Sequence, residues 1–205
     1  MELLTNKSTN NIERFRNIIA SNPPTSDEYY FVQIIKRKKD GHDANGNNLN
    51  RCVKYYNIKS LEDFDNVKDE IVSICEALNT RAYIYYSKKS FKETAKLMLK
   101  RVTDNIISEN HIGMKASHQA CCSECVPKEK TYLIDVDTKD TSVMDIINKC
   151  LDQCEPYEKS KVVDIIPSKS GFHIITIPFN VAKFRTLYKE DIDIHKNSPT
   201  ILYVK

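Results

Sequence analysis

The sequence predicts an α+β or α/β protein made of two adjoining units, residues 1–125 and 126–205. Three observations carry this prediction. Helical and strand patterns alternate along the chain without internal repeats. The composition, 40% hydrophobic and 29% charged residues, is that of an ordinary globular protein. The 205 residues suffice for one large domain or two small units that share a core.

The first unit is expected to hold three helices and three strands. In chain order these are a short helix, a hairpin of two strands, a long helix, a strand and a second long helix (residues 12–19, 29–35, 52–58, 60–78, 81–86 and 90–106). Asp40-Gly41 and Asn45-Gly46 are turn signals and predict a long hairpin tip.

Capping sequences define the starts of both long helices. Ser60 opens the first, and Ser90, three residues before Glu93, opens the second with a capping box. The three-to-four spacing of apolar residues in the second helix predicts a buried stripe of Phe91, Ala95, Met98, Val102 and Ile106. Residues 111–130 show no periodicity and are expected to form a loop.

The second unit has a simpler pattern. It predicts a strand, a helix, two strands joined by a tight polar turn, a short helix and two closing strands (residues 132–137, 142–154, 162–167, 173–177, 181–188 and within 191–204). The turn between the closing strands is Asn197-Ser198-Pro199.

The charge of the chain is nearly balanced, with a net value of +3 and a pI near 8.4, which neither requires nor excludes a nucleic-acid partner. Basic residues gather in residues 36–39 and again between Arg81 and Arg101, where they either follow a phosphate backbone or form solvated faces. The start has no apolar leader and no stretch approaches membrane-spanning length, so we expect a soluble cytoplasmic protein without a membrane partner.

The clearest chemical signal is Leu133-Ile134-Asp135-Val136-Asp137. Because side chains alternate along a strand, both aspartates project from one face, roughly 6–7 Å apart. Carboxylates held this close repel each other unless a cation or protons compensate them, and Mg²⁺ or Mn²⁺ prefers such oxygen ligands. The pattern alone also fits an exposed strand end with two solvated acids.

A second signal lies in the polar turn Ser168-Lys169-Ser170-Gly171 and the strand that begins near His173. Small residues let backbone amides approach an anion, while hydroxyls, a lysine and an imidazole can bind phosphate. The alternative is an ordinary β-turn next to a partly buried histidine. A third, weaker signal is Asp193, preceded by Asp191 and followed four residues later by Asn197.

Taken in order, these three signals resemble the motifs of the archaeo-eukaryotic primase superfamily. Asp135 and Asp137 match its first motif, Ser170-Gly171-Phe172-His173 its second, and Ile192-Asp193 its third. The motif style is similar to the bacterial end-joining primase-polymerase branch, and phage and plasmid relatives also exist. The resemblance covers the second half of the chain well and the first half in general layout.

The resemblance implies an α+β fold in which an N-terminal αβ unit packs on an RRM-like antiparallel sheet that carries the motifs. It implies a nucleotidyltransferase that adds nucleotides to a nucleic-acid 3′-hydroxyl, as in DNA replication. Asp135, Asp137 and Asp193 would hold Mg²⁺ or Mn²⁺. Ser168, Lys169, Ser170, Gly171 and His173 would bind the nucleoside triphosphate. A separate helicase or accessory replication protein would be a partner.

Arg81, Tyr83, Tyr85, Lys88 and Lys89 mix bases with aromatic rings and are candidates for template or primer binding. The tyrosines fit core positions equally well. Two other functions stay open: a weakly active or inactive module that binds nucleotides or nucleic acid, and a metal-dependent phosphoesterase that uses the same carboxylates.

Seven cysteines without a leader predict reduced thiols. Cys122 and Cys125 have CxxC spacing, and Cys150 and Cys154 lie four apart on a predicted helix that returns along its strand. From the rise per residue of strand and helix, the four thiols are expected to meet and bind a structural zinc ion. The alternative is that they pack as small core residues, as Cys75 is expected to do.

Overall fold

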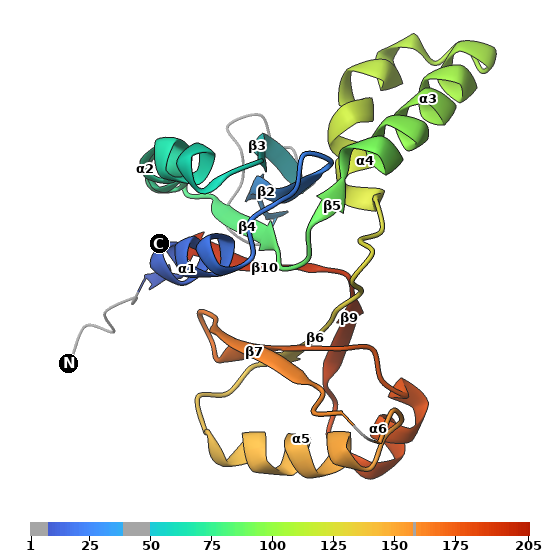
Figure 1. The fold of residues 1–205 in the computed structure, drawn as a ribbon. Helices are drawn as coiled ribbons and strands as arrows, with labels where there is room; N and C mark the ends of the chain where they lie inside the picture. Colours follow the sequence, from blue (N-terminus) through green and yellow to red (C-terminus); the bar gives the residue numbers. More distant parts are fainter. Residues whose placement is uncertain (1–7, 39–49, 158) are drawn as a thin grey trace.

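Two antiparallel sheets lie one above the other in the computed structural model, which describes residues 8–38, 50–157 and 159–205 (Figure 1). The chain therefore has an α+β architecture. Helices cover the face of the second sheet that is turned away from the first, so its other, inner face is directed at the first sheet. No helix in the described ranges is both long and apolar enough to cross a membrane.

The first sheet has the strand order β1-β10-β4-β2-β3, with β5 beside β2. The bounds of these strands are Thr9–Asn10, Pro199–Val204, Arg81–Tyr85, Glu28–Lys36, Arg51–Ile58 and Lys89–Ser90. The predicted hairpin is present as the antiparallel pair β2–β3, while its predicted tip lies outside the described residues. Helices α1 (Ile12–Ser21) and α2 (Leu61–Leu78) pack on one face of this sheet.

The second sheet has the order β7-β8-β6-β9. Its strands are Val162–Pro167, Phe172–Thr176, Tyr132–Val136 and Asp193–Lys196, and its helices are α5 (Ser142–Asp152) and α6 (Val181–Leu187). Ile134, Val136 and Ile174 point toward these helices and form a separate core with Ile147 and Phe184. Because side chains alternate along a strand, the neighbours Leu133, Asp135 and His173 point to the opposite face, toward the first sheet.

The last strand corrects the predicted division of the chain. The two closing strands do not pair with each other: β9 pairs with β6 in the second sheet, whereas β10 lies between β1 and β4 in the first. The boundary near residue 125 separates the sheets well, but residues 199–204 belong to the first sheet. The chain thus crosses between the sheets twice.

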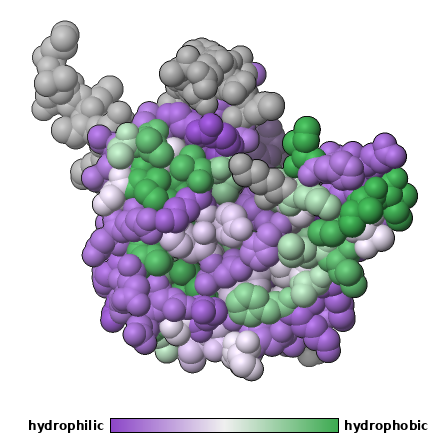
Figure 2. Space-filling view, turned by 90° about the horizontal axis from the view of Figure 1, so that it is seen from above, coloured by the Kyte–Doolittle hydropathy of each residue, from purple (hydrophilic) through white to green (hydrophobic). Residues whose placement is uncertain are grey.

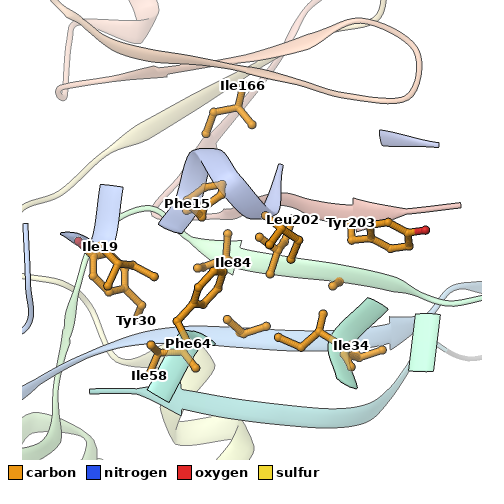
Figure 3. Packing of buried hydrophobic residues seen from close by; sticks show 14 of the residues in the cluster. Phe15, Ile19, Tyr30, Ile34, Ile58, Phe64, Ile84, Ile166, Leu202 and Tyr203 are labelled. Carbon is orange, nitrogen blue, oxygen red and sulfur yellow. The ribbon is translucent and has the colours of Figure 1, made fainter. Parts of the chain in front are cut away.

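The largest core joins the two sheets. Phe15 of α1 and Leu202 of β10 lie near Ile166 of β7 (Figure 3), and Leu133 and Ile175 belong to the same cluster. This shared core packs the second sheet against α1 and the last strand of the first sheet.

Helix α3 (Phe91–Ile107) begins as predicted, with the hydroxyl of Ser90 accepting from the backbone N–H of Glu93 at 3.1 Å. The predicted stripe is wrong, because α3 projects from the body with η2 (His111–Ala116) and α4 (Ser117–Glu124) (Figure 1). Thr94 is its buried residue, while Ile106 is 54% exposed. Figure 2 shows apolar residues gathered on this side of the molecule.

The segment 111–130 is not the loop that its lack of periodicity suggested. It contains η2 and α4, which close the arm back onto the first sheet. Asn110 provides a local signal for this turn, since its side-chain oxygen accepts from the backbone N–H of Gly113 at 3.2 Å. This is the type of side-chain cap that Asn favours.

Candidate active site

Asp135 occupies the centre of the inner face of the second sheet. It lies on β6 between two antiparallel neighbours, opposite His173 of β8 on one side and opposite Asp193 of β9 on the other. Directly opposed residues of an antiparallel pair share a face. The sheet register therefore brings residues of all three sequence signals to one place.

The electrostatics of this face are unfavourable to negative charge. Burial raises the pKa of Asp135, and the nearby charges of Asp137 and Asp193 raise it further, while His173 and His195 act in the opposite direction. Burial lowers the pKa of His173. The negative charge of these carboxylates is therefore compensated only in part within the protein. The group nearest to Asp135 is the imidazole of His173, whose Nε2 lies 3.4 Å from Asp135 Oδ1.

The polar turn lies against the end of β6. Ser168 closes it, donating its backbone N–H to the carbonyl of Gly171 at 2.9 Å and accepting the N–H of Gly171 on its hydroxyl at 3.1 Å. A Cβ on Gly171 would lie 2.0 Å from the backbone oxygen of Val136, so only glycine allows this approach. The approach brings the hydroxyl of Ser170 to 2.7 Å from Asp137 Oδ1.

A cleft of about 510 Å³ opens between the two sheets at this point. One wall carries Asp135, Asp137, Asp193, His173 and His195 together with Ser168, Lys169 and Ser170. The other wall comes from the first sheet and carries Arg37, Arg81 and Tyr83. An acidic wall and a basic, aromatic wall therefore face the same space.

Arg37 and His195 belong to the cleft although neither was singled out from the sequence. Arg37 lies in the basic run 36–39 and donates to the hydroxyl of Tyr83 at 3.3 Å, so the run itself was the available signal. His195 follows Asp193 by two residues, which puts both on one face of β9. Alternation along the predicted strand was therefore sufficient to identify His195.

The structure also distinguishes the two late aspartates. Asp193 is the register partner of Asp135, whereas Asp191 precedes β9 and lines a smaller pocket of about 240 Å³ beside the cleft. Asn197 lies in the turn after β9 with a φ of 50° and accepts from the backbone N–H of Thr131 at 3.2 Å. It shapes the turn and does not line the cleft.

Three residues predicted to bind nucleic acid lie elsewhere, which corrects that assignment. Lys89 is 1% exposed and Tyr85 is 8% exposed, so neither offers a surface to a nucleic acid. Lys88 is bound locally, with its ammonium group 3.1 Å from Glu28 and 2.8 Å from the side-chain oxygen of Asn22. Of this group, Arg81 and Tyr83 remain at the cleft.

The four cysteines of the predicted zinc site do not meet. Cys122 packs with Tyr29, Phe31 and Tyr85 under the arm, whereas Cys150 and Cys154 belong to the core beneath the second sheet. The geometric estimate failed because Cys125 ends a helix of the arm, which docks on the first sheet. Cys75 is fully buried, as predicted.

The chemistry of the acidic wall fits a hard divalent cation, because its three carboxylates supply oxygen ligands that repel one another in the absence of positive charge. Within the described part of the chain, no three His, Cys, Asp or Glu side chains are already arranged as a metal site. The carboxylates therefore lie along one wall of the cleft without converging on one point.

Comparison with known proteins adds no relative to this description. No protein-family model, no curated protein and no solved structure matches the chain. The residues of the cleft are accordingly the basis for an assignment of function.

Proposed function

We propose that this chain is a metal-dependent nucleotidyltransferase of the primase-polymerase type, which adds nucleotides to a nucleic-acid 3′-hydroxyl. The observation that carries the proposal is the cleft itself. Residues from three separate motifs, Asp135, His173 and Asp193, lie side by side in register on one of its walls, and arginines line the other.

The topology of the second sheet supports the same proposal. Its elements follow the order βαββαβ, from β6 through α5, β7, β8 and α6 to β9, and the first strand is central. This split βαβ arrangement is the topology of RRM-like units. In the primase superfamily the motifs stand on such a unit, and here Asp135 stands on its central strand.

The nucleotide phosphates fit the side of the cleft formed by the polar turn. Lys169 supplies positive charge there, and Ser170 and His173 supply hydrogen-bond donors. The ammonium group of Lys169 lies 3.2 Å from the carbonyl oxygen of Lys205 and is exposed, so it can turn toward an anion. Its neighbours are held more firmly by the Ser168–Gly171 contacts.

Arg81 and Tyr83 on the opposite wall are suited to a template or primer strand, because a cation binds the backbone and a ring stacks on a base. Asp135, Asp137 and Asp193 are the residues that would hold Mg²⁺ or Mn²⁺. A bound cation would offset the charge of the triphosphate and favour the 3′-hydroxylate.

The test is extension of a labelled primer on a template by the purified chain, with ribo- or deoxynucleotides and with Mg²⁺ or Mn²⁺. The double variant Asp135→Asn/Asp137→Asn is compared with Asp164→Asn. Asp164 is a matched control, because it lies on β7 of the same sheet, pairs with Arg14 at 2.7 Å and does not line the cleft.

Template-dependent extension that is lost in the double variant and kept in the control supports the proposal. Nucleotide binding without extension would instead indicate a binding module. Release of mononucleotides without polymer growth would indicate a phosphoesterase. Either of these last two results contradicts the polymerase assignment.

A further inference from the structure

Thr200 connects the last strand of the first sheet to the candidate active site. It lies on β10 opposite Ile84, is fully buried, and places its hydroxyl oxygen 2.7 Å from His173 Nδ1. His173 belongs to the second sheet, so this contact spans the two sheets. Among the described residues it is the one hydrogen bond of the imidazole, whose other polar contact is the 3.4 Å approach of Nε2 to Asp135.

The position of Thr200 is fixed by a second contact between the sheets. The side-chain amide of Asn11, itself 4% exposed, donates to the carbonyl of Ile201 at 3.0 Å and to the carbonyl of Pro167 at 2.9 Å. Pro167 ends the strand that leads into the polar turn. Asn11 therefore holds β10 and the edge of the turn together, one residue away from Thr200.

A count of donors and acceptors determines the direction of the Thr200–His173 hydrogen bond. A buried hydroxyl needs an acceptor for its hydrogen. Among the residues that the structure describes, His173 Nδ1 is the one partner recorded for the Thr200 hydroxyl. If Nδ1 carried a proton, it would donate to the Thr200 oxygen, and the buried hydroxyl hydrogen would be left without an acceptor among the described residues.

We infer that Thr200 donates its hydroxyl hydrogen to Nδ1 of His173 and thereby holds the neutral imidazole in the Nε2–H tautomer. Nε2 is the atom directed at the acidic wall, 3.4 Å from Asp135 Oδ1. The cleft is therefore offered an N–H donor by an uncharged ring. The opposite tautomer would present a lone pair, which repels both a carboxylate and a phosphate oxygen.

Thr200 is thus a positioning residue for His173, and its role toward a nucleotide rests on the proposed function. In that setting the Nε2–H donates to a phosphate oxygen of the incoming nucleoside triphosphate. The residue that orients it comes from β10, which belongs to the first sheet, so the site depends on both sheets for its hydrogen-bond pattern.

The direct test is the long-range ¹H–¹⁵N spectrum of the protein with ¹⁵N-labelled histidine, recorded in mildly alkaline buffer. His173→Gln removes one ring from the spectrum and so assigns the signals of His173. We expect Nδ1 to show the shift of an unprotonated nitrogen and Nε2 that of a protonated one. A proton on Nδ1 in the wild-type protein, with or without one on Nε2, overturns the inference.

Two variants then test whether the Thr200 hydroxyl determines the tautomer of His173. Thr200→Val keeps the shape and removes the hydroxyl, whereas Thr200→Ser keeps the hydroxyl. We expect Thr200→Val to give a mixture of tautomers and Thr200→Ser to retain the wild-type one. An unchanged tautomer in Thr200→Val would show that another group determines it. If Thr200→Val does not fold, the wild-type spectrum and the serine variant still decide.

Binding of ATP provides the readout on the site. Loss of one neutral hydrogen bond corresponds to about two- to tenfold weaker binding in Thr200→Val, with near wild-type binding in Thr200→Ser. A changed tautomer with unchanged ATP affinity overturns the positioning role. If the wild-type protein binds neither ATP nor dATP, the proposed function fails, whereas the tautomer measurement is unaffected by that failure.

Discussion

Lys89 in the first sheet and Asp135 in the second show two ways in which this protein treats a charge on a strand. The ammonium group of Lys89 donates to the carbonyls of Cys122, Ser123 and Cys125 at 2.7–3.0 Å. It also lies 3.7 Å from the centre of the Tyr85 ring. The end of α4 supplies these carbonyls, so Lys89 both neutralises a helix terminus and attaches the arm to the sheet.

Asp135 has no such set of partners in the described structure. Its recorded contact is the imidazole of His173, at the long distance of 3.4 Å, and its other charged neighbours include two aspartates. The difference teaches where to look for function. A charge satisfied within the protein stabilises the fold, whereas one left partly compensated at a cleft is available to a ligand.

The largest effect is expected from Asp135→Asn, which tests whether the partly compensated charge of the second sheet serves a ligand. If the carboxylate serves a ligand, nucleotide incorporation should fall by about 10²-fold or more, the effect of removing one main electrostatic group from a site. The free energy of unfolding without metal should hold or rise, because repulsion from Asp137 and Asp193 is relieved. Primer extension and thermal denaturation measure the two effects.

The control is again Asp164→Asn, which should leave incorporation unchanged and slightly lower stability through loss of the ion pair with Arg14. A destabilised Asp135→Asn protein that retains wild-type incorporation would show that Asp135 is structural.

A smaller effect is expected from Gly171→Ala, which separates the polar turn from β6. The new Cβ meets backbone atoms of Val136 and Thr138 at 2.0–2.8 Å, and backbone cannot move aside as a side chain can. We expect the free energy of unfolding to fall by about 1–3 kcal/mol, together with nucleotide binding. Urea denaturation and ATP titration check this.

Gly113→Ala is its matched control. The nearest atom to a Cβ there, 2.7 Å away, is the side-chain nitrogen of Asn110, which can rotate. Its cost should be clearly smaller than that of Gly171→Ala, and nucleotide binding should be unchanged. Equal costs in the two variants would argue against the close approach at Gly171.

The sequence was sufficient to predict most elements of the second unit, because its strands and helices have clean periods. The strand 162–167 matches β7, and the predicted helices 142–154 and 181–188 agree with α5 and α6 within two residues. Asp135 and Asp137 could be assigned to one face from alternation alone. That His173 and Asp193 would share a site with Asp135 followed from the resemblance and not from any local pattern, and that they flank it in register is seen only in the structure.

The sequence could not predict the contacts that depend on which of the two sheets a segment joins. Thr200 contacts His173 only because β10 pairs with strands of the first sheet, whereas the preceding strand β9 pairs in the second. The predicted cysteine site failed for the same reason, since distance along a strand and helix says nothing about where the arm docks. The α3 stripe failed because Ile106 lies on a projecting arm, with no sheet beneath it.

The smallest expected effect is that of Lys89→Met, which removes the satisfied charge of the first sheet. Methionine fills a similar volume, so relief from burying a charge offsets part of the loss of three hydrogen bonds. We expect the free energy of unfolding at neutral pH to fall by about 1 kcal/mol and ATP binding to stay unchanged. A loss of ATP binding without a loss of stability would contradict the assignment of Lys89 to the fold.

The pH dependence of the free energy of unfolding of this variant tests how the protein treats the charge of Lys89. Burial lowers the pKa of Lys89 to about 8, from an ordinary value of 10.5. Between these two values the unfolded chain binds more protons than the folded one, so the stability contributed by Lys89 rises with pH. Cys122 and Cys125 face the same ammonium group and are present in both proteins. The stability difference between wild type and Lys89→Met should therefore widen from pH about 7 to about 9 in urea denaturation. A difference that stays constant over this range would mean that the three carbonyls keep the ammonium group protonated in the folded protein, and that Lys89 acts as a permanent charge.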